Sequence, residues 1–178
     1  MQLNIYLLNH PIIQILSNNK IEKNTPIYYL RCQQLSLFII YEIVRKWIET
    51  QIIYIKKINY IQNIAITDQT NSYYIITDLT KSHYITAAIS SILPNTNFVD
   101  VNYLEKIEDE QNNRKVIFFE ESLCNYKIIK SIDYLYKHKK INNNDIKVAC
   151  IICNNKILDL IGNNYPNLEI YTTKIIKS

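Results

Sequence analysis

The sequence of 178 residues contains a single glycine, Gly162. Proteins of average composition contain about 7% glycine, which would give roughly a dozen here. Phosphate-binding loops, dinucleotide-binding fingerprints and the nucleophile elbow of hydrolases each need at least two closely spaced glycines. An isolated glycine therefore excludes these three kinds of site.

Long apolar runs are missing too. Charged or amide side chains interrupt the apolar residues every few positions, so no stretch reaches the roughly 18 residues that a membrane-spanning helix needs. Residues 1–14 have neither a basic segment nor a small-residue cleavage site. We therefore expect no secretory signal, no transit peptide and no membrane partner.

The excess of basic residues is small. Lys and Arg number 20 against 16 Asp and Glu, a formal net charge of +4. Such a charge permits contact with nucleic acid but does not argue for it. Basic clusters at residues 56–57 and 137–140 leave RNA binding open as an alternative. A basic cluster at the end of a helix, however, more often compensates the helix dipole, and we expect no nucleic-acid partner.

The four cysteines are expected to be reduced thiols, because no secretory signal accompanies them. Cys150 and Cys153 form a C-x-x-C pair within an apolar run that predicts a buried strand, and an offset of three places them on opposite faces of it. No second pair completes a four-ligand metal site. We expect buried structural thiols, with metal or redox chemistry as the open alternative. The three histidines are scattered without ligand spacing.

Four residue types dominate the composition. There are 36 Ile, 22 Asn, 17 Lys and 15 Tyr, together 90 of the 178 residues. These residues share A/T-rich codons, so the bias indicates an A/T-rich genome rather than a particular fold. We expect a plastid origin, although an A/T-rich bacterium would give the same composition.

Apolar periodicity predicts an α/β fold. From residue 27 to 47 the pattern indicates a long helix with Leu30, Leu37, Phe38, Tyr41 and Val44 on one side. Other expected helices span 11–16, 82–93, 125–138 and 156–161, and expected strands span 72–79, 98–101, 115–119, 146–152 and 168–171.

Strands that alternate with helices predict a parallel sheet with helices on both faces. Residues 1–178 are expected to form one domain with a small N-terminal helical and hairpin appendage. The Ile- and Tyr-rich segment 52–66 indicates two strands, and 52–70 is a candidate hairpin arm. Ligand sites in parallel sheets lie beyond the carboxyl ends of strands, here after Leu79, Val101, Phe119, Ile152 and Tyr171.

Five segments, in order along most of the chain, resemble uracil phosphoribosyltransferases. Residues 9–14, NHPIIQ, are similar to that family's "HPLIQ", and 165–172, YPNLEIYT, to its "HPDVEIYTAAID". Residues 40–45, 92–95 and 131–135 are similar to "AYEVTR", "LIPNA" and "AIDLL". The resemblance implies the type I phosphoribosyltransferase fold and a role in pyrimidine salvage. It also implies a dimer or larger oligomer, so we expect a homodimer or another protein partner. The segment 52–66 is a candidate contact, unless it packs over the sheet.

The resemblance also points to the segments that bind phosphoribosyl pyrophosphate in the family. The glycine-rich "VDPMLATGGS" corresponds to residues 116–127, which keep the strand and the acidic Glu120 and Glu121 but have Asn125 and Lys127 near the glycine positions. "PILRAGLG" corresponds to residues 77–84, where Lys81 is a candidate cation. These five residues are vestigial substrate-binding candidates, and side chains of residues 125–127 are expected to fill part of the phosphate site.

The C-terminal uracil-binding segment is expected to be largely missing, because this sequence ends seven residues after Tyr171. We therefore expect a divergent, C-terminally truncated homologue that has lost catalysis and has a binding or structural role. No catalytic residue, metal or cofactor is assigned, and Mg²⁺ is expected only if activity is retained. The alternatives are an active uracil phosphoribosyltransferase, forming UMP and diphosphate, and an RNA-binding pyrimidine regulator.

Overall fold

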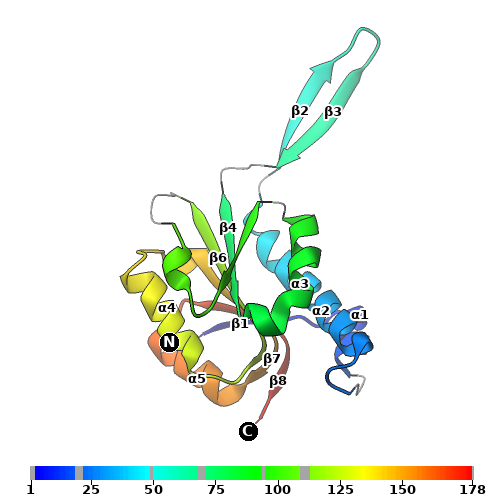
Figure 1. Ribbon diagram of the computed structural model, residues 1–178. Helices are drawn as coiled ribbons and strands as arrows, with labels where there is room; N and C mark the ends of the chain where they lie inside the picture. The colour runs from blue at the N-terminus through cyan, green and yellow to red at the C-terminus, as the bar shows by residue number, and fades with distance from the viewer. Residues whose placement is uncertain are drawn as a thin grey trace.

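The computed structural model describes residues 3–18, 22–48, 50–67, 71–93, 95–108 and 113–177 (Figure 1). Its helices are α1 (Pro11–Asn18), α2 (Pro26–Val44), α3 (Leu79–Ile92), α4 (Lys127–Lys137) and α5 (Asn155–Asn164). Its strands are β1 (Asn4–Leu7), β2 (Thr50–Lys56), β3 (Ile61–Thr67), β4 (Ser72–Thr77), β5 (Thr96–Asp100), β6 (Arg114–Leu123), β7 (Ile146–Asn154) and β8 (Glu169–Ile176). Short 3-10 helices span Leu104–Lys106 and Asn143–Asp145.

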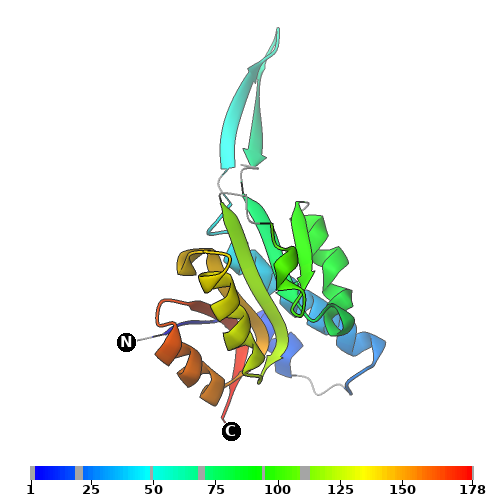
Figure 2. The same cartoon turned by 60° about the vertical axis from the view of Figure 1, so that its left-hand side comes forward.

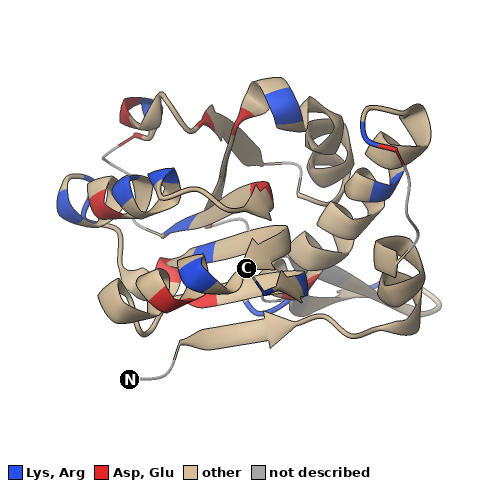
Figure 3. Cartoon of the chain, turned by 90° about the horizontal axis from the view of Figure 1, so that it is seen from below, with Lys and Arg blue, Asp and Glu red and all other residues tan. Residues whose placement is uncertain are grey.

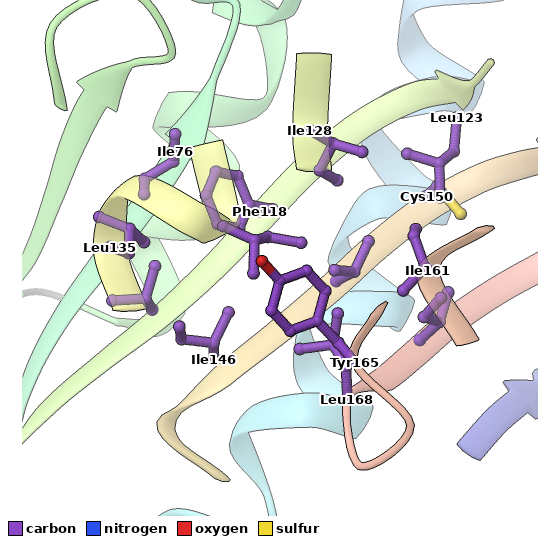
Figure 4. Packing of buried hydrophobic residues seen from close by; sticks show 14 of the residues in the cluster. Ile76, Phe118, Leu123, Ile128, Leu135, Ile146, Cys150, Ile161, Tyr165 and Leu168 are labelled. Carbon is purple, nitrogen blue, oxygen red and sulfur yellow. The ribbon is translucent and has the colours of Figure 1, made fainter. Parts of the chain in front are cut away.

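Six strands form one sheet in the order β1-β8-β7-β6-β4-β5, and every neighbouring pair is parallel. Helices α4 and α5 pack on one face, where Phe118, Leu135 and Ile161 are buried together (Figure 4). Helices α1, α2 and α3 pack on the other face around Phe119 and Ile39. The predicted parallel sheet with helices on both faces is confirmed.

Strand β1 was not predicted from the sequence. Its four residues are all exposed and pair in parallel with β8, from Asn4 opposite Glu169 to Leu7 opposite Thr172. Beyond it, the Leu8 N–H donates to the Thr172 carbonyl at 2.9 Å. The strand depends on pairing with a segment more than 160 residues away, which local periodicity cannot indicate.

The predicted apolar side of α2 is not the side that faces the core. The buried residues are Cys32, Leu35, Ser36, Ile39, Ile40, Ile43 and Val44. Of the residues predicted to share one side, Val44 is in this set and Phe38 packs partly buried against the same core, while Leu30 and Tyr41 are 54% and 56% exposed. Helix α2 is therefore apolar on two sides, and only one of them is covered by its own sheet.

The cysteine pair also departs from the prediction. Cys150 and Cys153 are both fully buried in the core beneath α4 and α5, on the same face of β7. Ile151 and Ile152 both face the opposite core, so the alternation of side chains is interrupted between them. Burial and the neighbouring Cys153 raise the pKa of the Cys150 thiol. All four cysteines are free thiols, and the expectation that this pair is buried is confirmed.

The segment predicted as two strands is an antiparallel hairpin of β2 and β3, with Thr50 opposite Thr67 and Lys56 opposite Ile61. We call residues 50–67 the arm. Neither strand joins the six-stranded sheet, and both views show the arm standing away from the body of the molecule (Figures 1 and 2). The alternative that these residues pack over the sheet is therefore wrong.

In the part of the chain that the structure describes, no helix combines the length and the apolar character needed to span a bilayer.

Candidate functional site

The chain changes direction across the sheet between β4 and β6. From β4 it continues through α3 to β5 on one side, and it then returns to place β6 on the other side of β4. Helices that leave neighbouring strands toward opposite faces open a crevice at the carboxyl ends of those strands. A cavity of about 250 Å³ lies there, and we call it the switch-point cavity. It is lined by Thr77, Asp78, Lys81, Ser82, Val101, Asn102, Phe119, Glu120, Glu121, Ser122, Asn125 and Lys127.

All five residues predicted from the sequence line this cavity. Lys81 comes from α3, Glu120 and Glu121 from the end of β6, and Asn125 and Lys127 from the turn and the first residue of α4. Of the five segments predicted to carry ligand contacts, those that follow β4, β5 and β6 meet here. Of the other two, the one after Tyr171 contributes Thr173 and Lys174 to a second cavity of about 180 Å³, which Glu121, Ile151 and Ile152 also line, whereas no residue after Ile152 on β7 lines either cavity.

Beside the end of β4, the edge of the switch-point cavity is formed by side chains and not by a glycine-rich backbone. Asp78 caps α3, accepting from the Lys81 N–H at 3.3 Å and forming an ion pair of 2.9 Å with the Lys81 ammonium. This contact holds the pKa of Asp78 below its usual range. Asp100 accepts from the Leu79 N–H at 3.1 Å and from the Asn102 N–H at 2.9 Å, which fixes the neighbouring loop.

Glu120 is partly buried and lies between positive and negative neighbours. Burial raises its pKa to about 7, and the nearby Asp78 acts in the same direction, whereas Lys81 and Lys127 oppose the shift. At neutral pH the carboxyl is therefore divided between its protonated and ionised forms. It can donate one hydrogen bond when protonated and only accept when ionised.

Glu121 is already engaged. Its Oε1 accepts a hydrogen bond from the Tyr28 hydroxyl, and its Oε2 accepts from the Tyr84 hydroxyl at 3.3 Å. Burial and the carboxylate raise the pKa of both tyrosines well above the usual range, and burial raises the pKa of Cys32 nearby to about 11. No local pattern in the sequence indicates these partners, because Tyr28 lies 93 residues from Glu121.

The turn from β6 to α4 is built without left-handed backbone. Among the described residues, positive φ angles occur only at Asn24, Asn113 and Lys140, all outside this turn. The Cys124 N–H donates to the Ser122 carbonyl at 3.0 Å, so this amide is not directed at a ligand. Of the side chains expected to fill the site, Asn125 and Lys127 line the cavity, whereas Tyr126 is 59% exposed and lies outside its lining.

Thr77 supplies a polar group that the sequence did not single out. The residue is 2% exposed, lines the switch-point cavity, and its Oγ1 has no hydrogen-bond partner among the described residues. A buried hydroxyl without a partner costs stability, roughly 1–3 kcal/mol. A ligand in the cavity would supply the missing partner.

The acidic residues fit a magnesium ion poorly. Within the described ranges, no group of three or more His, Cys, Asp or Glu side chains is placed to hold a metal ion. Glu121 is occupied by two tyrosines, and Glu120 is only partly ionised at neutral pH. Mg²⁺ prefers charged oxygen ligands in octahedral geometry, which this pair does not offer.

The basic clusters considered for RNA binding are partly used inside the fold. Lys139 is 9% exposed, and its ammonium donates to the carbonyls of Glu105 and Ile107 at 3.3 and 2.7 Å. Lys137 forms an ion pair of 3.3 Å with Asp133. Acidic and basic residues are interspersed over the side of the molecule shown in Figure 3. A continuous basic stripe is therefore not seen on that side.

Comparison with known proteins gives two close relatives. The chain is 34% identical over 187 aligned residues to a uracil phosphoribosyltransferase homolog of Porphyra purpurea, with 98% of this chain and 89% of the relative covered. It is 31% identical over 182 aligned residues to the protein of the same name from Pyropia yezoensis, with the same coverage. No family model matches the chain.

A solved structure shares the fold. The AQ2163 protein from Aquifex aeolicus superposes with a TM-score of 0.72, covering 97% of this chain and 88% of that one. The identity is 14%, so this similarity concerns the architecture alone. It extends over nearly the whole described chain.

Proposed function

This chain belongs to the family of uracil phosphoribosyltransferase homologues, and we propose that it keeps the family's fold and crevice without transferring ribosyl phosphate to uracil. The observation that carries the proposal is the turn from β6 to α4. It uses no left-handed backbone, engages the Cys124 N–H internally, and places Asn125 and Lys127 at the cavity. A phosphate held by converging amides needs the close backbone approach that glycine permits.

The state of Glu121 supports the same proposal. Transferases of this kind accelerate the reaction by positioning the substrate and stabilising charge at the reacting centre. The Glu121 carboxylate already accepts one hydrogen bond on each oxygen, from Tyr28 and Tyr84, so its orientation is set by these tyrosines and only its remaining lone pairs are available to a ribose hydroxyl. Glu120 is then the acidic side chain without a tyrosine partner, and its pKa is about 7.

We assign the remaining chemistry of the cavity to binding. Lys81 and Lys127 offer two ammonium groups, Asn125 an amide, and Thr77 a buried hydroxyl without a partner. Ammonium groups suit phosphate oxygens, and amide and hydroxyl groups suit sugar hydroxyls. The proposed ligand is a small phosphorylated sugar, held without turnover.

The test is an assay for UMP with uracil, phosphoribosyl pyrophosphate and Mg²⁺, run beside calorimetric titration with phosphoribosyl pyrophosphate and ribose 5-phosphate. We expect no UMP above the protein-free rate. We also expect binding that weakens in Lys127→Ala and Thr77→Val and remains in Lys130→Ala, an exposed control on α4. UMP formation that Glu120→Gln abolishes would show an active enzyme. Lack of binding by either sugar phosphate would leave only a structural role.

An RNA-binding role is less well supported. Lys139 is buried and engaged with backbone carbonyls, which removes one charge from the cluster at 137–140. Electrostatic binding to RNA weakens steeply as salt is raised. Titration of structured RNA at two salt concentrations would reveal such binding, and we expect none.

A further inference from the structure

Two helices begin beside the switch-point cavity, on opposite faces of the sheet (Figure 1). Helix α3 follows β4 and brings Lys81 to the lining of the cavity, and α4 follows β6 and brings Lys127. The N-terminus of an α-helix carries partial positive charge and N–H groups without helical partners, which together favour an anion. The cavity therefore has two places at which a phosphate group could be held.

The place at α3 is already filled by carboxylates of the chain itself. The Leu79 N–H donates to Asp100 Oδ2 at 3.1 Å, and the Lys81 N–H donates to Asp78 Oδ1 at 3.3 Å. The Ser82 N–H donates to the Asp78 carbonyl at 2.9 Å, and the Lys81 ammonium is paired with Asp78 Oδ2. Two negative charges thus stand where an anion would bind, and both would repel a phosphate group brought there.

The place at α4 differs in both charge and capping. The first turn of this helix contains no acidic residue, and its N-cap residue, Tyr126, makes no side-chain hydrogen bond to the first amides. Lys127, the first residue of the helix, adds an ammonium group at the cavity. An ammonium group beside a helix N-terminus is a favourable position for a phosphate. Of the two places, the one at α4 therefore suits an anionic ligand.

The other polar groups of the cavity indicate what else the ligand carries. Thr77 is 2% exposed, and its Oγ1 has no hydrogen-bond partner within the described part of the chain. The Glu120 carboxyl, present in both protonation forms at neutral pH, can donate to a hydroxyl or accept from one. Hydroxyl groups on a ligand would satisfy both residues. The volume of about 250 Å³ lies below the roughly 300–1,000 Å³ of pockets for drug-sized ligands, so the ligand is small.

We propose that the switch-point cavity selects phosphate monoesters of small sugars, with the phosphate at the N-terminus of α4, and that Asp78 and Asp100 exclude a second phosphate group at α3. This inference rests on the proposed function, binding without turnover, and specifies which sugar phosphates are bound. A site discriminates between ligands by placing unfavourable charge against the wrong one as well as by contacting the right one. The two carboxylates at α3 are such a repulsive element against a sugar diphosphate.

The experiment is calorimetric titration of the full chain with ribose 5-phosphate and with phosphoribosyl pyrophosphate, each with and without Mg²⁺. The two ligands share one phosphate and differ by the diphosphate, and we expect ribose 5-phosphate to bind at least about tenfold more tightly. Asp78→Asn keeps an oxygen that can cap α3 and removes one negative charge. It should strengthen binding of the diphosphate about tenfold and binding of ribose 5-phosphate less than about threefold. Asp159→Asn, at an exposed position of α5, is the control and should change neither affinity.

Circular dichroism checks that each variant is folded. Asp100→Asn is the second variant, because it leaves the Asp78 cap in place and should shift the two affinities in the same way. Equal affinities of the wild type for the two ligands would overturn this inference and leave the proposed function standing. A preference that both variants leave unchanged would also overturn it, since the carboxylates would then not be its cause. Binding of neither ligand would overturn the proposed function itself, and this inference with it.

Discussion

At the scale of single residues, Glu120 makes the stability of the fold depend on pH. Its pKa is about 7 in the folded chain and about 4.3 when the chain is unfolded. Between these values the folded state binds more protons than the unfolded state, so the free energy of unfolding falls as pH rises from about 4.5 to 7. The value of about 7 already includes the opposing effects of Lys81 and Lys127, and at 1.36 kcal/mol for each pKa unit we expect a loss of about 3 kcal/mol.

The measurement is urea denaturation at pH 5 and pH 8. Glu120→Gln should be close to wild type in stability at pH 5 and more stable than wild type at pH 8. Asp159→Asn, at an exposed position of α5, is the control. Its difference in stability from wild type should be the same at pH 5 and at pH 8. A Glu120→Gln variant whose difference from wild type is the same at both pH values would contradict the assignment.

The tyrosine pair on Glu121 allows a second prediction at the same scale. Tyr28→Phe removes one of two hydroxyls that donate to a partly buried carboxylate, and hydrogen bonds to charged groups contribute about 1.5–3 kcal/mol. We expect a loss of that order in the free energy of unfolding. Tyr29→Phe is the matched control, because its hydroxyl bonds only the exposed Asn24 side chain at 3.1 Å. Equal effects of the two substitutions would mean that the contact with Glu121 contributes nothing.

At the scale of elements, Lys139 joins the end of α4 to the 3-10 helix at Leu104–Lys106. Its ammonium satisfies the carbonyls of Glu105 and Ile107, and Lys139→Met would leave both without this donor. Groups left unsatisfied by such a loss cost about 1–3 kcal/mol. Thermal unfolding should therefore show a clearly lower midpoint for Lys139→Met than for Lys130→Met, which changes an exposed lysine of α4. Equal midpoints would contradict the bridging role.

The sequence predicted the elements whose patterns are local. Every long helix and the strands β4 to β8 of the alternating units were found, and the five candidate residues do meet at one cavity. The misses depend on distant contacts. Strand β1 exists through pairing with β8, the core side of α2 is selected by the sheet beneath it, and Glu121 is held by Tyr28 from the start of α2. Periodicity reports which residues are apolar, but it does not report which of two apolar sides is covered.

At the scale of the whole molecule, the single glycine allows close packing between distant segments of the chain. Gly162 lies in α5, where an added Cβ would come 3.3 Å from the Leu3 Cβ, so it lets the N-terminal segment approach the helix. The crevice between β4 and β6 is built from residues with side chains.

The plastid origin that composition indicates stays a prediction, and sequencing the neighbouring genes would test it.

The arm should be dispensable for folding of a single chain but necessary for association. Thr50 and Thr67 are paired partners at its base, so their Cα atoms are about 5 Å apart, and a short Gly-Ser loop can replace residues 50–67. The arm contributes no strand to the sheet, and we expect the shortened chain to be a folded monomer. Its urea midpoint, measured at low protein concentration, should match that of the full chain. At high concentration only the full chain should gain stability, because association favours the folded state by mass action. A shortened chain that fails to fold would show that the arm supports the core of its own molecule.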